Sequence, residues 1–292
     1  MPNIRKILKI LTRKPTIEGA GVHLNRVFGF YELPLLDPFL LLDDFRSDNP
    51  EDYIRGFPCH PHRGIETITY VIDGSVAHGD SLKNKGVIGS GDVQWMTAGS
   101  GIIHQEMPEG NKEGKMGGFQ LWTNLPASHK MIDPMYRDVK NYQIPEISFD
   151  NGVKIKIICG QIGQTKGPVN DIVTDPEYLD ITIPAGVEFI HHTKSEHTVF
   201  AYIIGGSGLF DGSIPISKNS SPLIINGNLV LFEKGEHLKV NTLDEYVRFL
   251  LISGKPIGEP IAWYGPIVMN SQEELQIAFE EYNNGAFIKY KI

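Results

Sequence analysis

The stretch that decides the fold is RGFPCHPHRGIETITYVIDG, residues 55–74. It is rich in β-branched and aromatic residues and contains glycines at both ends, which is typical of strands bounded by turns. Residues two apart in a strand point to the same face, so His60 and His62 share one face. Imidazoles inside a β-barrel are costly unless a partner satisfies their ring nitrogens. The stretch therefore predicts a strand that carries a ligand site.

The rest of the chain repeats this pattern of short strand-like runs between glycines and prolines. The spacing predicts an all-β sandwich or barrel, and the βαβ alternation of a parallel sheet is missing. The second half repeats the style of the first, so we expect a duplicated antiparallel barrel with domains at residues 1–133 and 134–292. The clearest runs are PFLLLDDF (38–45), GDVQWMTAG (91–99), GGFQLWTNL (117–125), VKIKIICGQIG (153–163) and LVLFEKGEHLKV (229–240).

Two segments depart from the strand pattern. Residues 124–147, NLPASHKMIDPMYRDVKNYQIPEI, contain several prolines and have poor strand character, so we interpret them as a connection between the barrels with a helical turn. Residues 271–285, SQEELQIAFEEYNNG, predict a C-terminal helix, because Ser271 and Glu274 have capping-box spacing and Gly285 ends the pattern. The apolar stripe of this helix is expected to pack on a barrel.

Composition excludes several classes of protein. The chain has 292 residues and a formal net charge of -8, which gives no overall attraction to nucleic acid or to an anionic membrane. No apolar run reaches the roughly 18 residues that a membrane span needs. Cys59 and Cys159 are the two cysteines, too few for a disulfide framework. We expect a cytoplasmic monomer without a nucleic-acid or membrane partner.

A second pair of polar residues has the spacing of the first. In GSGIIHQEMPEG (99–110), His104 and Glu106 are also two apart and share a face if this segment is extended. Two antiparallel strands that each present such a pair would gather three imidazoles and one carboxylate. This donor set suits a divalent transition metal, and sets of this kind with open positions suit non-haem iron. We favour iron; ligand type alone leaves nickel, copper, manganese and zinc open.

Other polar residues near the two pairs have alternative interpretations. Glu66 is a competing carboxylate, but it is in phase with His60 only if the strand stays regular through Gly64, so we favour Glu106. His78 and Asp80 are also two apart, yet they follow the Gly74 turn and are expected on an exposed hairpin. Three of the histidines in the second half lack a carboxylate at matching spacing, and we expect a surface loop there: His191, His192 and His197.

Several segments together resemble the pirin family of the cupin superfamily. They are DPFLLLDDF (37–45), GFPCHPHRGIETITYV (56–71), GDVQWMTAGSGIIHQEMP (91–108), GGFQLWTNLP (117–126) and GPIVMN (265–270), so the likeness spans nearly the whole chain. The resemblance implies a bicupin, that is two antiparallel jelly-roll barrels, with a metal site in the N-terminal one. It places the metal ligands on His60, His62, His104 and Glu106. The family commonly has an acidic residue where this chain has Cys59.

The resemblance also implies a function. Pirin-like proteins have quercetin 2,3-dioxygenase activity, so we expect an iron-dependent dioxygenase that opens a flavonol-like aromatic substrate with O2. Glu106 is the expected catalytic proton acceptor. We expect the walls of the substrate pocket to be apolar and aromatic; the candidates are Phe57, Trp95, Met96 and Phe119.

A regulatory role is the alternative that the resemblance leaves open. Animal members of the family are nuclear and modulate transcription complexes, with the iron oxidation state altering the surface that they offer. The chain would then be an iron-binding, redox-responsive cofactor of transcription with a protein partner, and a nuclear location applies if the source is eukaryotic. The sequence shows no basic nuclear signal.

Overall fold

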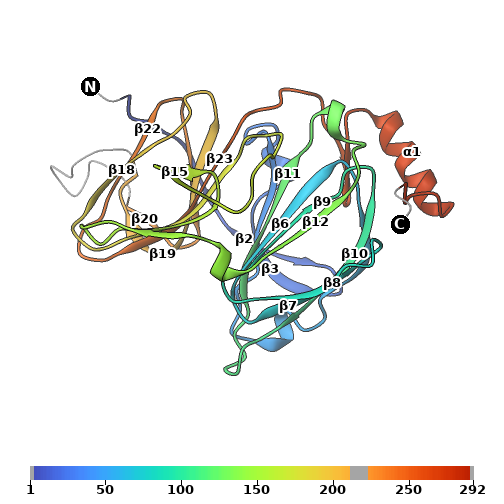
Figure 1. Cartoon of the computed structure of the whole chain (residues 1–292), viewed down its shortest axis with the longest axis horizontal. Coiled ribbons are helices and arrows are strands. Elements are labelled where there is room, and N and C mark those ends of the chain that lie inside the picture. Colours follow the sequence, from blue (N-terminus) through green and yellow to red (C-terminus); the bar gives the residue numbers. More distant parts are fainter. Residues whose placement is uncertain (1–2, 211–222, 290–292) are drawn as a thin grey trace. The chain divides into compact units, whose positions relative to one another are not determined.

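The computed structural model describes residues 3–210 and 223–289, and nearly all of its regular structure is antiparallel β-sheet (Figure 1). The chain divides into two compact units. The first β unit consists of Lys14–Asn141 and Ile257–Ile292, and the second of Met1–Arg13 and Tyr142–Pro256. Each unit therefore takes one terminal segment from the other half of the chain. This division differs from the boundary at residues 133 and 134, which stays a prediction from the sequence.

The first β unit packs two open sheets face to face, and a short hairpin and a helix follow them. The larger sheet has the order β12-β9-β6-β11-β4-β3-β2, and the smaller has the order β5-β10-β7-β8. Its strands are β2 (Lys14–Glu18), β3 (Val22–Phe28), β4 (Phe39–Asp44), β5 (Phe57–His62), β6 (Ile65–Asp73), β7 (Ser75–Asp80), β8 (Lys85–Gly89), β9 (Val93–Thr97), β10 (Ile102–Glu109), β11 (Gly117–Asn124), β12 (Met135–Val139), β24 (Ala262–Tyr264) and β25 (Ile267–Met269).

The second β unit is built in the same style around its own apolar core. Its main sheet has the order β1-β21-β19-β23-β17-β14-β13, with β20 paired to β19, and β15-β16 and β18-β22 form two separate ladders. The strands are β1 (Ile7–Thr12), β13 (Glu146–Ser148), β14 (Lys154–Cys159), β15 (Gln161–Ile162), β16 (Thr165–Lys166), β17 (Glu177–Ile183), β18 (Glu188–His192), β19 (Thr198–Gly208), β20 (Ile224–Ile225), β21 (Asn228–Phe232), β22 (His237–Asn241) and β23 (Val247–Gly254).

The helical elements are few and short. Within residues 3–210 and 223–289 the only α-helix is α1 (Gln272–Asn283), which has Ser271 as N-cap and forms the capping box with Glu274 that the sequence predicted. It buries Leu275 and Ala278 within the first β unit. Four 3-10 turns complete the elements: η1 (Phe30–Glu32), η2 (Pro50–Asp52), η3 (Ala127–His129) and η4 (Asn141–Gln143). No helix among the described residues has the length and apolar character needed to cross a membrane.

The architecture confirms the all-β antiparallel prediction, with two differences. The sheets are open and not closed barrels. Residues 124–147, interpreted from the sequence as a connection, contain η3 but also the strand β12, which pairs with β9 in register Met135 to Thr97. The sequence has low strand propensity there, and β12, an edge strand of its sheet among the described residues, is extended because it pairs with β9.

Candidate metal centre

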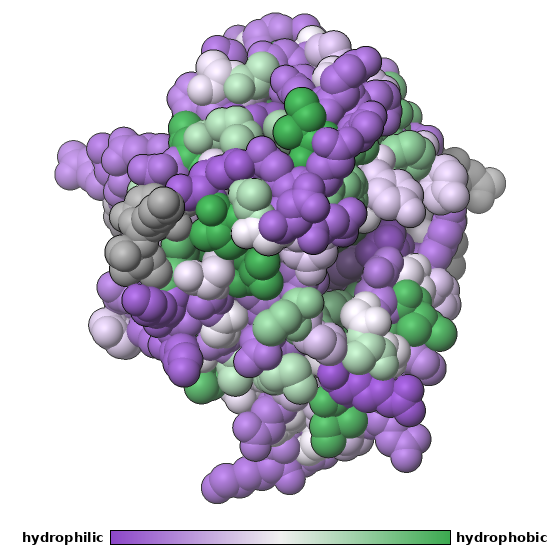
Figure 2. Space-filling model, turned by 90° about the vertical axis from the view of Figure 1, so that its right-hand side faces the viewer, coloured by the Kyte–Doolittle hydropathy of each residue, from purple (hydrophilic) through white to green (hydrophobic). Residues whose placement is uncertain are grey.

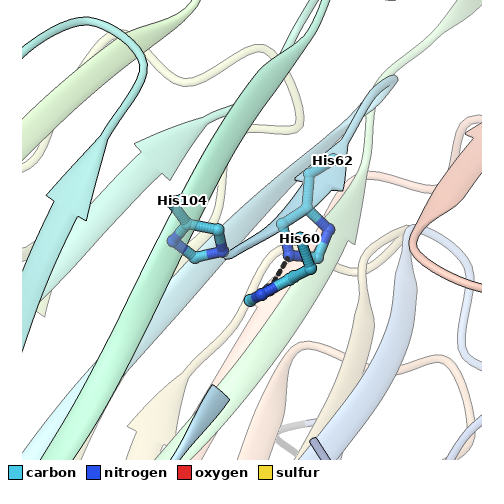
Figure 3. Close-up of side chains that lie close together, drawn as sticks. All are labelled: His60, His62 and His104. Atoms are coloured by element: carbon cyan, nitrogen blue, oxygen red, sulfur yellow. Dashed lines mark hydrogen bonds between the residues drawn. The ribbon is translucent and has the colours of Figure 1, made fainter. Parts of the chain in front are cut away.

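Two strands of the smaller sheet bring three imidazoles together. β5 pairs antiparallel with β10, with His60 opposite His104 and His62 opposite Ile102. His62 and His104 are buried and His60 is half-buried. The ligand nitrogens of the three residues all lie within 4.8 Å of one another, and Figure 3 shows the three rings converging. The predicted two-residue spacing on β5 therefore does place both imidazoles on one face.

Backbone carbonyls fix the tautomers of two of these histidines. His60 Nδ1 lies 2.8 Å from the Pro58 carbonyl oxygen, and His62 Nδ1 lies 3.1 Å from that of Pro266. A carbonyl oxygen can only accept, so each Nδ1 carries the hydrogen and each neutral ring keeps its lone pair on Nε2. The two Nε2 atoms are 3.1 Å apart (Figure 3). Facing lone pairs at this distance repel, unless a cation or a shared proton lies between them.

His104 lacks any such partner. Both of its ring nitrogens are buried, and neither has a hydrogen-bond partner within the described part of the protein. A buried polar group without a partner costs about 1–3 kcal/mol. Desolvation by burial, together with repulsion from His62, His60 and His78, lowers the pKa of His104 well below its ordinary value. The ring is therefore neutral, and the lone pair on one of its nitrogens is free to bind a cation.

These observations fit a transition-metal ion. Two nitrogens bound at adjacent positions about 2.1 Å from one cation lie roughly 3.0 Å apart, close to the His60–His62 separation. Three neutral imidazoles suit zinc, copper, iron and nickel. Carbonyl acceptors on the Nδ1 side are the usual means of orienting metal-binding histidines. His60, His62 and His104 are thus the residues of the chain that would hold a metal.

Glu106 lies beside this group and not within it. Its side chain is buried on the same side of β10 as that of His104. Thr69 Oγ1 donates to Glu106 Oε1, and Gln120 Nε2 donates to Oε2, both at 3.1 Å. The carboxylate is therefore oriented by two donors from the larger sheet. Its role as a fourth ligand stays a prediction.

The competing carboxylate, Glu66, is held on the other side of the larger sheet. It pairs with Thr97, whose hydroxyl donates to Glu66 Oε1 at 2.7 Å. Thr69, the partner of Glu106, lies an odd number of positions from Glu66 on β6 and so points to the opposite face. Desolvation by burial raises the pKa of Glu66. Strand alternation thus separates Glu66 from the imidazoles.

A pocket of about 700 Å³ opens onto His60 and His62. Of the four residues predicted for the substrate pocket, Phe57 is among its lining residues, whereas Trp95, Met96 and Phe119 are buried and are not. Trp95 and Phe119 pair with Ile68 and Tyr70, on the sheet face that Glu66 occupies, and Met96 packs in an apolar cluster. The aromatic walls come instead from Phe30, Tyr31, Trp122, Trp263 and Tyr264.

His78 is a buried residue and not part of an exposed hairpin surface, which corrects the sequence-based expectation. Its Nε2 lies 3.1 Å from Asp80 Oδ2, and Gln94 Nε2 lies 3.2 Å from its Nδ1. The ring stacks on Tyr136 and lies 5.4 Å from the His104 ring. β7 pairs with β10, so His78 faces Glu106 across the ladder. In the sequence, the two-residue spacing of His78 and Asp80 was the feature that indicated a shared face for these two side chains.

The second β unit shows no comparable group of three donors among its described residues. Its β18–β22 ladder presents Phe189, Leu238 and Val240 to the apolar core. His191 is paired with Glu177 at 2.9 Å and is buried, in contrast to the surface loop expected from the sequence. The core-facing positions of this ladder therefore hold apolar side chains together with His191, which is paired with Glu177.

Lowered histidine pKa values predict acid sensitivity of the metal-free protein. Burial and the neighbouring His60 lower the pKa of His62, as for His104. Below about pH 6.5 the unfolded chain binds protons that the folded protein does not, so stability falls as pH falls. We expect the free energy of unfolding of metal-free protein, measured by urea denaturation, to drop between pH 7 and 5, by at most about 1.4 kcal/mol per pH unit for each histidine. An equal pH slope in His62→Gln/His104→Gln protein would contradict this assignment.

Comparisons with known proteins agree with this architecture. The family model described as Pirin matches residues 21–123, and the Pirin C-terminal cupin domain matches residues 178–288. A Pseudomonas aeruginosa protein named "Putative quercetin 2,3-dioxygenase PA3240" is 43% identical over 289 residues, covering 98% of this chain and 99% of that protein. A pirin-like protein of Caulobacter vibrioides is 40% identical over 97% of this chain and 99% of its own length. The crystal structure of a quercetin 2,3-dioxygenase from Acinetobacter baumannii has a TM-score of 0.86 at 29% identity, covering 97% of this chain and 98% of that one.

Proposed function

Because the chain belongs to the pirin family and has its bicupin fold, we propose that the first β unit is a metal-dependent dioxygenase for a flavonol-like aromatic substrate. The observation that supports this most is the group of three imidazoles, two with facing Nε2 atoms and one whose ring nitrogens have no hydrogen-bond partner among the described residues. The names of two relatives, quercetin 2,3-dioxygenases, supply the substrate class.

Iron is the metal that we propose, and nickel, copper, manganese and zinc accept the same donors. A metal held by His60, His62 and His104 would supply a Lewis acid and an open position where a substrate oxygen and dioxygen can meet. The protein contributes the orientation of the rings, through the carbonyls of Pro58 and Pro266. It also keeps His62 and His104 away from bulk water.

Glu106 is the proposed proton acceptor of the reaction. A flavonol hydroxyl must lose its proton before its oxygen can bind a cation strongly, and a positioned carboxylate is suited to accept that proton. Glu106 is buried next to His104 on β10, and its donors Thr69 and Gln120 hold its orientation. We also propose that Glu106 would be the fourth ligand of a bound metal, and the same carboxylate would accept the proton of the substrate hydroxyl.

The shape and lining of the pocket suit a flat aromatic molecule. Trp122 lies edge-on against His62 with ring centroids 5.0 Å apart, and Trp263 lies 5.9 Å from Trp122. Phe30 meets Trp263 in an edge-to-face contact at 5.8 Å. These rings form an apolar wall from the imidazoles toward the exposed Phe30. Aromatic walls with a few polar groups at one end are typical of small-molecule sites.

Replacing Trp122 with Ala is expected to weaken substrate binding more than the chemical step. The ring contributes wall area in the pocket, and its Nε1 has no hydrogen-bond partner in the described part of the protein, so KM for quercetin should rise about tenfold while kcat changes less. Steady-state oxygen consumption over a range of quercetin concentrations measures both constants. An unchanged KM would remove Trp122 from the substrate wall.

Oxygen consumption by iron-loaded protein with quercetin tests the proposed function. We expect uptake that depends on both quercetin and metal and that stops when a chelator removes the metal. Full metal occupancy without turnover on any flavonol would contradict the dioxygenase and favour the regulatory alternative.

On the face shown in Figure 2, hydrophobic residues form separate small groups among hydrophilic ones, so the drawn part of that face offers no continuous apolar patch for a protein partner.

A further inference from the structure

The C-terminal segment of the chain, residues 257–289 as described, lies in the first β unit and meets the strand that carries the histidines. Ile267 forms a parallel bridge with Arg63, and the Val268 amide donates to the Arg63 carbonyl at 3.1 Å. Immediately before this bridge, the Pro266 carbonyl accepts the hydrogen of His62 Nδ1. The acceptor that fixes the His62 tautomer therefore comes from a segment about 200 residues away in sequence.

Arg63, the residue after His62, binds this segment through two of the three nitrogens of its guanidinium. Nε donates to the Ser100 carbonyl, Nη1 to Glu281 Oε2 on α1 and Nη2 to the Phe287 carbonyl, each at 2.8 Å. The guanidinium carbon also lies 4.3 Å from the centre of the Phe287 ring. The side chain is 2% exposed. The buried guanidinium of Arg63 has a well-placed acceptor at each of its three nitrogens. Removing this side chain would leave those acceptors without their donor, so the interaction is specific.

Gly64 and Lys130 complete the contact on the other side of Arg63. Gly64 has φ +78, and a Cβ at this position would lie 2.0 Å from the Val268 carbonyl oxygen. Lys130 Nζ donates to the carbonyls of Gly64 and Val268, at 2.8 and 3.0 Å. The close approach thus requires glycine here, and a buried ammonium joins the two backbones. The glycine of HPHRG is explained by this crossing segment.

We propose that Arg63 is a positioning residue for the metal centre: it holds the C-terminal segment so that the Pro266 carbonyl keeps His62 Nε2 directed at the metal. The proposal rests on the metal site of the proposed function. His60 takes its acceptor from Pro58 on its own strand, so His62 is the one of these two rings that depends on a distant segment. Changes to residues that orient a ligand typically cost 10–100-fold in metal affinity.

The experiment compares Arg63→Met with Arg46→Met in the full-length protein, with Co(II) as the probe. Arg46 is a matched control, because it also pairs with a carboxylate, at 2.6 Å from Asp44, and lies over an aromatic ring, that of Phe119, and it is not among the residues that line the pocket at His60 and His62. Affinity is measured by competition with a chelator, and the visible d–d bands of Co(II) report the geometry of its ligands. Unfolding midpoints are recorded for both variants.

Arg63→Met is expected to bind Co(II) roughly 10–100-fold more weakly with altered d–d bands, whereas Arg46→Met keeps affinity within about twofold and wild-type bands even if it is less stable. Wild-type affinity and bands in folded Arg63→Met would overturn the proposal. Should that variant not fold, Glu281→Ala removes one partner from the partly exposed side. A smaller loss of affinity in Glu281→Ala supports the proposal, and none overturns it.

The outcomes separate this proposal from the dioxygenase itself. Wild-type protein that binds Co(II) but never consumes oxygen with a flavonol refutes the proposed function, while the effect of Arg63→Met on affinity still stands. Wild-type turnover together with unchanged affinity in Arg63→Met refutes the positioning role and leaves the function intact.

Discussion

His62→Ala protein is expected to lose metal binding and, with it, all quercetin-dependent oxygen consumption. The substitution removes one of three donors whose nitrogens lie within 4.8 Å of one another. Because changes to residues behind a ligand already cost roughly 10–100-fold, loss of the ligand should lower affinity by more than about a hundredfold. Metal content by elemental analysis and binding by chelator competition measure the effect.

His192→Ala is the matched control for this substitution. His192 is exposed and lies on β18 in the second β unit, so its removal should leave metal content and turnover unchanged. Equal metal content in His62→Ala and wild-type protein would show that the ion binds elsewhere. Loss of metal in His192→Ala would point to the second β unit instead.

Glu106→Gln is expected to lower the rate of quercetin oxygenation by about 10²–10⁴-fold, the usual worth of a positioned acid or base. Glutamine keeps the size of the side chain but cannot accept a proton from the substrate hydroxyl. Turnover of metal-saturated variant, followed by oxygen consumption, isolates the chemical role from any change in affinity.

Glu66→Gln is the control, because the same change is made at a buried glutamate on the opposite face of the larger sheet. It should leave kcat within a few-fold of wild type. If Glu66→Gln instead abolished turnover while Glu106→Gln had little effect, the assignment of the proton acceptor would be reversed.

The local part of the site was predictable from the sequence because it depends on strand periodicity. His60 and His62, and His104 and Glu106, are each two apart, and each pair shares a face once β5 and β10 are extended. The pairing of His60 with His104 needs in addition that these strands be neighbours in one particular register. The same reasoning predicted α1 from its capping box.

The pocket walls and the acceptor of His62 could not be predicted, because they depend on tertiary contacts that strand periodicity does not determine. Trp95 and Phe119 were predicted as pocket walls, but their positions on β9 and β11 put them on the other face of the larger sheet. The alternation of side chains along a strand sorts residues into two faces, but it does not show which face packs against the smaller sheet. Trp263 and Pro266 reach the site only because residues 257–289 return to the first β unit, a long-range contact without a local signal.

Anomalous X-ray diffraction from crystals of protein purified without added metal tests the central claim most directly. Data collected above and below the absorption edges of iron and the competing metals identify the ion and its position in one measurement. The account predicts a single transition-metal peak per chain, bounded by the Nε2 atoms of His60 and His62 and by a ring nitrogen of His104. A peak only beside the histidines of the second β unit, or none at all, would contradict it.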